Sequence, residues 1–370
     1  MKDFISLYLP TSGPNSIKDS SCSYKKVTSY HQNGKIEYEG EINDFNNKKE
    51  GKGIYYYENG NKMYIGYWQH NKKQGQGIYF YDENGYKMYD GEFDNDKRHG
   101  KGTSYYKNGL KMYEGSFKEE KRHGFGKSYE KDGSLKYSGQ WFNNQKSGQG
   151  TYFYYNGVEQ YVGTWKHDKK NGFGNERTIT NALIYSGQFT NDLRDGQGES
   201  YRNNGIILYK GSWKDNKKKG QGILYKLDGQ ILLEGIWNNN SLDEITKYWH
   251  MPKKTDGKIL QSLIYYKSVY YGEVEEGMAH GYGVMLLRDN CVLLYEGEFR
   301  FGIEHGVGRE FSYDGDLRYI GEFDHGRKNG IGSSYELGGK LEYQGFWSDG
   351  FVDDFFIKWK DNGEVEMYMI

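Results

Sequence analysis

The chain has 370 residues, of which 53 are glycine, 38 are tyrosine and only 3 are proline. Its formal net charge is −1, so the whole molecule exerts no strong attraction on nucleic acid, and no nucleic-acid partner is expected. Aromatic residues make up 17% of the chain, which is enough to build a core although 27% of the residues are charged. The two cysteines lie far apart in the sequence, which favours a reducing, cytoplasmic compartment over a disulfide framework.

Residues 1–30 show no repeat and are predicted to form an N-terminal segment outside the main fold. Their apolar stretch FISLYL is bounded by Asp3 and Pro10, a pattern that does not indicate a signal peptide. No apolar run in the chain approaches the roughly 20 residues that a transmembrane helix needs.

A unit of about 24 residues then recurs thirteen times. Its marker is the glycine of a Y-x-G-x-aromatic motif. The step from Gly235 to Gly272 is longer than the others, and the series then resumes. The glycines are Gly40, Gly66, Gly91, Gly115, Gly139, Gly163, Gly187, Gly211, Gly235, Gly272, Gly297, Gly321 and Gly345. A fixed period of this kind indicates a repeat protein rather than two or three globular domains.

The first half of a unit reads as a β-strand. In residues 111–135, Tyr113, Gly115 and Phe117 alternate with polar residues, which is the period of a strand. The tyrosine is present in twelve of the thirteen units, and the third motif position is aromatic in eleven. We interpret these rings as core rather than as a ligand site, with the glycine leaving room for neighbouring rings to lie over the backbone.

The second half of the unit predicts a second strand. Gly124 and Gly126 form a G-x-G pair, and an aromatic ladder position follows at Tyr129. Asp132-Gly133 ends the unit, and equivalent Asn-Gly or Asp-Gly pairs predict type I′ turns. The predicted fold is therefore all-β: an elongated, twisted, single-layer antiparallel meander of 24-residue hairpins.

The pattern Y-E-G-S-F…K-R-H-G-F-G resembles the MORN repeat, whose usual form is Y-x-G-x-W, a short basic loop and then G-x-G. The resemblance covers about nine-tenths of the chain. It implies an elongated β ribbon and a role in scaffolding, membrane contact or both. MORN arrays occur in junctophilins, in plant phosphatidylinositol phosphate kinases and in radial spoke head proteins of cilia.

No enzyme signature accompanies the repeats, so neither catalytic residues nor a cofactor is expected. The G-x-G motif recurs within hairpins, whereas a dinucleotide site needs it between a parallel strand and a helix. Four histidines, His99, His123, His280 and His305, occupy one position in different repeats. Even neighbouring members should lie about 10 Å apart, so no shared metal site is expected.

The loops before the G-x-G pairs are basic and form the candidate anion-binding or lipid-binding site. A regular basic stripe could meet phosphoinositide headgroups on a membrane. The alternative is that these lysines are solvated and protect the sheet from aggregation. The candidate residues are Lys72, Lys73, Lys97, Arg98, Lys121, Arg122, Lys169, Lys170, Lys217, Lys218 and Lys219.

Units nine and thirteen lack the G-x-G pair and share a different feature. In each, a second tryptophan follows the first by twelve residues, Trp237 to Trp249 and Trp347 to Trp359. Terminal repeats are often atypical, so these units are predicted to close two arrays. The predicted arrays span 31–250 and 269–370, with an insert or hinge at 251–268. The alternative for that segment is a plain insertion without a bend.

These features predict a non-catalytic scaffold that presents an extended surface to other proteins. By analogy with the resembled family, the expected location is the cytoskeleton, in particular the ciliary axoneme as a radial-spoke-type component. The alternatives are a phosphoinositide-binding membrane tether and a regulatory subunit of a separate enzyme. A second copy of the chain is a further expected partner, and the two copies would form a homodimer by pairing through the last strand, around Glu364–Ile370.

Overall fold

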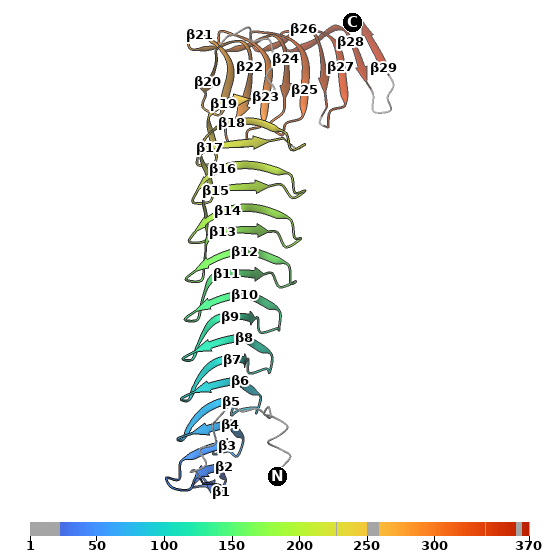
Figure 1. Cartoon of the computed structure of the whole chain (residues 1–370). Helices are drawn as coiled ribbons and strands as arrows, with labels where there is room; N and C mark the ends of the chain where they lie inside the picture. Colours follow the sequence, from blue (N-terminus) through green and yellow to red (C-terminus); the bar gives the residue numbers. More distant parts are fainter. Residues whose placement is uncertain (1–22, 227, 250–258, 337, 360–364, 370) are drawn as a thin grey trace. The chain divides into compact units, whose positions relative to one another are not determined.

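The computed structural model describes residues 23–226, 228–249, 259–336, 338–359 and 365–369. These residues form β-strands and their connections, and no helix occurs among them. The chain divides into two compact units between Asp192 and Leu193. Figure 1 labels the strands of both units.

The first unit contains fourteen strands, each of seven to nine residues. They are β1 (Tyr24–Tyr30), β2 (Ile36–Asn43), β3 (Lys49–Tyr56), β4 (Lys62–Gln69), β5 (Lys72–Phe80), β6 (Lys87–Asp94), β7 (Lys97–Tyr105), β8 (Lys111–Lys118), β9 (Lys121–Tyr129), β10 (Leu135–Phe142), β11 (Gln145–Phe153), β12 (Glu159–Lys166), β13 (Lys169–Arg177) and β14 (Leu183–Thr190).

The second unit contains fifteen strands. They are β15 (Leu193–Tyr201), β16 (Ile207–Lys214), β17 (Lys217–Tyr225), β18 (Ile231–Asn238), β19 (Ser241–Tyr248), β20 (Leu260–Ile264), β21 (Ser268–Glu275), β22 (Met278–Leu287), β23 (Leu293–Arg300), β24 (Ile303–Phe311), β25 (Leu317–Asp324), β26 (Arg327–Tyr335), β27 (Leu341–Ser348), β28 (Phe351–Trp359) and β29 (Val365–Met369).

The strands form two antiparallel sheets, one of 19 strands from β1 to β19 and one of 10 strands from β20 to β29. Within each sheet, strands that follow one another in the sequence pair, and glycines lie opposite glycines along the sheet. Gly115 of β8 faces Gly126 of β9, which in turn faces Gly139 of β10. The predicted all-β antiparallel meander of repeated hairpins is confirmed.

Two strands lie outside the thirteen predicted units. β1 pairs with β2 along its whole length, within the segment 1–30 that shows no repeat. β20 pairs with β21 and lies within the predicted insert 251–268. Residues 250–258 of the predicted hinge lie outside the described residues, so the division into two arrays and the bend both stay predictions.

From the second repeat on, a two-residue turn joins the two strands of each repeat, and this turn has type I′ geometry. Both turn residues have positive φ, as in Asn95 (φ 49°) and Asp96 (φ 70°) between β6 and β7. Glu119 (φ 46°) and Glu120 (φ 70°) repeat this geometry between β8 and β9. Positive φ at both central residues defines the type I′ turn, whose twist matches that of the flanking strands.

The Asn-Gly and Asp-Gly pairs lie at the opposite end of the hairpins, and the prediction of type I′ turns there is wrong. At Asn108-Gly109 only the glycine has positive φ (84°). The Asn108 side chain accepts a hydrogen bond from the Leu110 N–H at 3.1 Å, and Gly109 N–H donates to the Tyr106 carbonyl at 2.9 Å. This is a longer loop that ends in a left-handed glycine, a common alternative for hairpins.

The first tyrosine of each motif is buried against the glycines of its own hairpin. Tyr113 is 1% exposed, and its hydroxyl donates to the Ser116 carbonyl at 3.0 Å. A Cβ atom on Gly126 would lie 2.1 Å from the Tyr113 Oη, and one on Gly115 would lie 2.4 Å from the Gly126 Cα. Only glycine fits at these two positions, because the ring and the facing strand occupy the space of any side chain.

The aromatic residue at the third motif position joins the repeats into a continuous core. The Tyr113 ring packs edge-on against Phe117 of its own repeat at 5.0 Å, and against Trp141 of the next repeat at 5.5 Å. Trp141 Nε1–H donates to the Gly126 carbonyl at 3.1 Å. Edge-to-face pairs of this kind add to the stabilisation from burial alone. We call the side of the sheets that carries these rings the aromatic face.

Candidate functional site: cations on the aromatic face

The basic residues before the G-x-G pairs fall into two classes. The residue two positions before the first glycine is half-buried on the aromatic face, because it lies opposite the third motif residue of its hairpin. Arg122, for example, pairs with Phe117, and Lys146 pairs with Trp141. We call these residues the inner cations: Lys49, Lys73, Arg98, Arg122, Lys146, Lys170, Arg194, Lys218 and Lys328.

The residue before each inner cation is exposed, because successive side chains of a strand point to opposite faces. Six exposed lysines occupy this position in the first sheet, and we call them the outer lysines. They are Lys48, Lys72, Lys97, Lys121, Lys169 and Lys217. The candidate stripe of the sequence therefore divides between two faces of the sheet, and the remaining candidate, Lys219, is also exposed.

Each inner cation lies over aromatic rings. Lys146 Nζ is 3.9 Å from the centroid of the Trp165 ring and 4.9 Å from that of Tyr152. Lys49 Nζ is 3.9 Å from the Tyr55 centroid, and Arg122 Cζ is 4.1 Å from the Trp141 centroid. A cation within about 6 Å of a ring centroid is attracted by the negative face of the ring.

Burial changes the acid–base properties of these side chains. It lowers the pKa of Lys49, Lys73, Lys146 and Lys218 below the ordinary value of 10.5, because a charged ammonium group loses hydration when it is buried. Burial also lowers the pKa of the Arg122 guanidinium, for the same reason. For Lys73 and Lys146, the turn carboxylates Asp96 and Asp168 oppose this lowering of the pKa.

Some inner cations are neutralised by a carboxylate. Lys170 Nζ lies 2.5 Å from Glu176 Oε1, and Lys328 Nζ lies 3.0 Å from Glu310 Oε2. The Nζ atoms of Lys49, Lys73 and Lys146 form neither an ion pair nor a hydrogen bond within the described part of the chain. In the first unit these three lysines are therefore charges without a direct counter-ion on the aromatic face.

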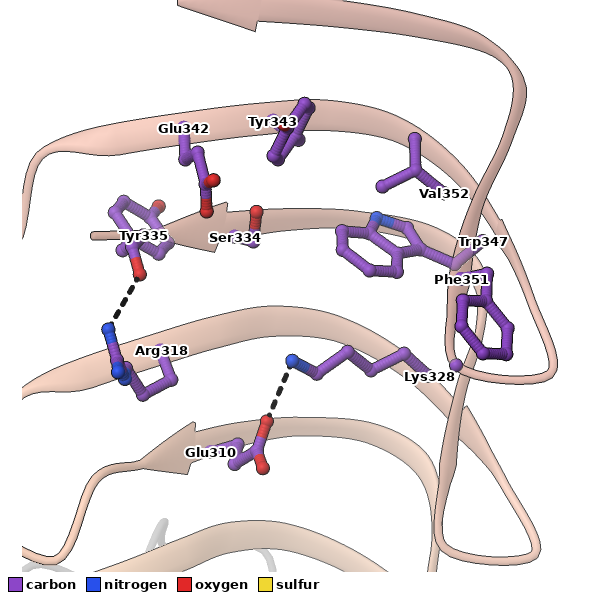
Figure 2. Close-up of a pocket in the computed structure, with 11 residues that line it drawn as sticks. Glu310, Arg318, Lys328, Ser334, Tyr335, Glu342, Tyr343, Trp347, Phe351 and Val352 are labelled. Atoms are coloured by element: carbon purple, nitrogen blue, oxygen red, sulfur yellow. Dashed lines mark hydrogen bonds and ion pairs between the residues drawn. The ribbon is translucent and has the colours of Figure 1, made fainter.

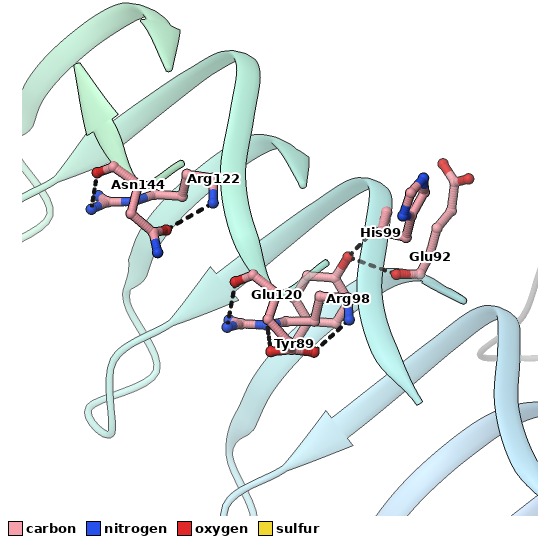
Figure 3. Close-up of polar contacts among 7 residues, drawn as sticks. All are labelled: Tyr89, Glu92, Arg98, His99, Glu120, Arg122 and Asn144. Carbon is pink, nitrogen blue, oxygen red and sulfur yellow. Dashed lines mark hydrogen bonds and ion pairs between the residues drawn. The ribbon is translucent and has the colours of Figure 1, made fainter. Parts of the chain in front are cut away.

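The type I′ turns hold the inner cations in place. The backbone N–H of Arg122 donates to Asn144 Oδ1 at 2.8 Å, and the Asn144 N–H donates to the Arg122 carbonyl at 3.0 Å (Figure 3). Glu120 holds the backbone of Arg98 in the same way and also pairs with its side chain, Nε to Oε2 at 2.8 Å. The second turn residue of one repeat thus positions the inner cation of the repeat before it.

The second unit has a pocket of about 490 Å³ on the same face, over β24 to β28 (Figure 2). The Lys328–Glu310 ion pair crosses one side of it, and Arg318 Nη1 donates to the Tyr335 carbonyl at 3.5 Å. Trp347 and Phe351 lie on the other side. Both signs of charge line this pocket, so it lacks the uncompensated positive charge of the first unit.

The predicted structural residues lie as follows. Phe117, Trp237 and Trp347 are buried, and Tyr129 is half-buried with its hydroxyl 3.3 Å from Glu114 Oε2. Trp249 is 45% exposed, and Lys247 Nζ stacks over its ring at 3.5 Å. Gly124 has a positive φ of 71°, and Trp359 is half-buried.

The candidate residues predicted from the sequence omit four inner cations, Lys49, Lys146, Arg194 and Lys328; the loops of Lys146 and Arg194 carry only one basic residue each. Inner cations are identified by their position two residues before the G-x-G pair, and not by the number of basic residues in the loop. In the first sheet, Lys or Arg lies two residues before every G-x-G pair, whereas Ala279 and Glu304 occupy this position in two repeats of the second sheet.

The sheets, turns and buried ladders define a class of protein: a β-hairpin repeat protein with one aromatic face. A model of the MORN repeat matches eleven segments, and the chain belongs to the MORN repeat family. The matched residues are 38–62, 64–85, 89–111, 113–134, 137–159, 161–177, 185–206, 209–231, 270–292, 295–317 and 319–335. As a MORN repeat protein, the chain is a repeat scaffold or binding protein.

The other comparisons add no argument. No curated protein matches the chain. Among solved structures, a chain of a mutant Tc holotoxin pore from Photorhabdus luminescens matches at 12% identity with a TM-score of 0.16, over 86% of this chain and 17% of that chain. Within the described residues, no helix is long and apolar enough to cross a membrane, and no group of His, Cys, Asp or Glu could hold a metal ion.

Proposed function

We propose that this chain is a non-catalytic scaffold whose aromatic face binds protein partners in a larger assembly. The observation that carries the proposal is the row of inner cations over rings, which presents the same chemistry at successive repeats of one face. Two-stranded repeats advance by about 10 Å, so such a row suits a long partner better than a small substrate.

The proposed location is the cytoplasm, in a cytoskeletal assembly and in particular the ciliary axoneme, as a component of the radial-spoke type. Membership of the MORN repeat family supports this assignment, because the chain resembles radial spoke head proteins in its repeats. A second copy of the chain is a further proposed partner. β29 pairs with β28 on one side, and no described strand pairs with its other side, which leaves an edge for another chain.

Co-sedimentation with detergent-extracted ciliary axonemes tests the proposal. The purified chain is mixed with axonemes over a range of concentrations, and the bound fraction is measured in the pellet. The proposal expects saturable binding that remains at physiological ionic strength. A chain that stays in the supernatant at every concentration would contradict the axonemal assignment.

The outer lysines favour a second candidate function, a phosphoinositide-binding membrane tether. They are exposed at equivalent positions of six repeats, and each charge near an anionic bilayer contributes about 1 kcal/mol. Flotation with vesicles that contain phosphatidylinositol bisphosphate tests this function. Neutralising Lys97 and Lys121 should abolish flotation if the outer lysines bind lipid, whereas neutralising the inner cations Arg98 and Arg122 is the matched control.

A further inference from the structure

The uncompensated charge of the first unit is concentrated at three inner cations. Lys49, Lys73 and Lys146 have their Nζ atoms over rings and without a direct counter-ion among the described residues. Carboxylates attract these lysines without pairing with them directly: Glu37 of β2 acts on Lys49, and the turn residues Asp96 and Asp168 act on Lys73 and Lys146. Glu37 accepts a hydrogen bond from the Tyr55 hydroxyl, whereas Asp96 and Asp168 use Oδ1 to accept the backbone N–H of Lys73 and Lys146 respectively. The turn carboxylates are therefore committed to the backbone and do not pair directly with the ammonium groups.

The second unit shows what can cover an inner cation. Residues 288–292, which connect β22 to β23, lie against the aromatic face at β16 to β19. Leu242 N–H donates to the Arg288 carbonyl at 2.7 Å, and Arg288 Nε donates to the Leu242 carbonyl at 3.0 Å. Cys291 of this segment is 4% exposed and lies beside Lys218 and Trp237. A turn of the polypeptide chain thus covers the inner cation Lys218.

From these two observations we propose that Lys49, Lys73 and Lys146 bind the carboxylates of an acidic polypeptide segment laid along the aromatic face. The inference rests on the proposed scaffold function and names the class of its partner. Charge complementarity selects an acidic partner, and the segment over Lys218 shows that the face accepts polypeptide. A flat anionic membrane would meet the exposed outer lysines before these half-buried ones.

The spacing of the site predicts the spacing of the partner's acids. Adjacent repeats advance by about 10 Å, which three residues of a polyproline II segment also span at about 3.1 Å each, with every third side chain on the same side. Lys49 and Lys73 belong to adjacent repeats, whereas Lys146 lies three repeats beyond Lys73. A segment with an acid at every third residue therefore places carboxylates in register with all three lysines.

Fluorescence anisotropy with a synthetic probe tests the proposal. The probe is a labelled peptide of seven Glu-Thr-Ala units, and its control is the same peptide with Gln in place of Glu. The full chain is titrated at about 0.15 M salt, where exposed charges are screened beyond about 8 Å. We expect saturable binding of the Glu probe and binding of the Gln probe that is about tenfold or more weaker.

Two matched variants locate the binding. Lys73→Met with Lys146→Met keeps the apolar stems over the rings but removes two charges, and should weaken the Glu probe about tenfold. Lys72→Met with Lys169→Met removes the same charge from outer positions and should change the affinity less than about twofold. A circular dichroism melt of each variant shows that the fold is intact.

Three outcomes overturn the proposal: equal binding of the Glu and Gln probes, an inner variant that binds like the wild type, or an outer variant that loses binding equally. If the inner variant instead loses flotation with phosphatidylinositol bisphosphate vesicles while probe binding is unchanged, the anion is a lipid headgroup and the proposal is wrong. Axoneme co-sedimentation that survives in the inner variant would leave the scaffold function standing without this partner class.

Discussion

Lys146 connects two repeats: it pairs in register with Trp141 of its own hairpin, and its Nζ lies 3.9 Å from the centroid of Trp165 in the next hairpin. The apolar stem of a lysine can cover a ring while its ammonium group stays at the rim. One side chain thus contributes both to the core and to the charge of the binding face. This double role fits the Lys or Arg found at the inner position of every repeat of the first sheet that has a G-x-G pair.

Replacing a glycine that lies under a tyrosine ring should disrupt the packing of that ring and lower the stability of the protein. We expect Gly126→Ala to destabilise the protein by about 1–3 kcal/mol, since the new Cβ would lie 2.1 Å from Tyr113 Oη and force the ring to move. The measurement is the midpoint of urea unfolding followed by tyrosine fluorescence. Lys127→Ala, at the exposed neighbouring position, is the control and should shift the midpoint little. Equal midpoints for both variants would contradict the close packing.

Removing only the buried hydroxyl of Tyr113 should destabilise the protein less than Gly126→Ala does. Tyr113→Phe keeps the ring and loses the hydrogen bond to the Ser116 carbonyl, for an expected destabilisation of about 0.5–1.5 kcal/mol. Tyr155, which is 77% exposed, supplies the control Tyr155→Phe. The same urea titration checks both variants, and a loss at Tyr155 as large as that at Tyr113 would argue against a specific role for the buried bond.

The turn residue Asn144 combines a backbone role with a side-chain role, and two substitutions separate them. Asn144→Gly tolerates the φ of 71° and loses only the bond to the Arg122 N–H, at a cost of about 1 kcal/mol. Asn144→Ala loses the same bond and keeps a Cβ in the left-handed region without the polar side chain that offsets its strain, so it should be about 1–2 kcal/mol less stable than the glycine variant. Thermal melts should rank the wild type above the glycine variant and the glycine variant above the alanine variant.

Stability should fall at alkaline pH because of the buried tyrosines. Burial raises the pKa of Tyr64, Tyr113 and Tyr161 well above the ordinary 10.0, and that of Tyr201 to about 12. Below pH 10 both states are protonated and the full stability is present. Above pH 10 the unfolded state loses protons that the folded state keeps, so the free energy of unfolding decreases as pH rises.

Absorbance of tyrosinate at alkaline pH measures this effect. Part of the tyrosine absorbance should appear only together with the loss of the β-sheet circular dichroism signal, above pH 10. Ionisation of all 38 tyrosines near pH 10 with the sheet intact would contradict the buried ladder.

The fold could be predicted from the sequence because its determinants are local and repeated. Tyr113, Gly115 and Phe117 show the period of a strand, and thirteen copies in phase remove the ambiguity of one. The turn type was assigned to the wrong end, since Asn-Gly is the strongest local signal for a type I′ turn. Glu119-Glu120 gives no such signal, and its positive φ values come from pairing of the flanking strands rather than from residue preference.

The candidate site was predictable only in part. Reading the loops by charge found Lys73 and Arg122 together with outer lysines, because a count of basic residues does not separate the two faces. Lys146 lacks a basic neighbour in its loop and was missed. The contacts over Trp165 and Tyr152 depend on how adjacent repeats pack, which no single unit encodes.

Site-specific photo-crosslinking tests most directly the claim that the aromatic face is the binding face. A photoreactive phenylalanine replaces Tyr79, whose ring lies 4.7 Å from Lys73 Nζ, or Phe125, which is 65% exposed and points to the opposite face. Each full-length variant is bound to detergent-extracted axonemes and irradiated. The account predicts cross-links to an axonemal protein from position 79 and not from position 125. Cross-links from position 125 alone would place the partner on the other face and contradict it.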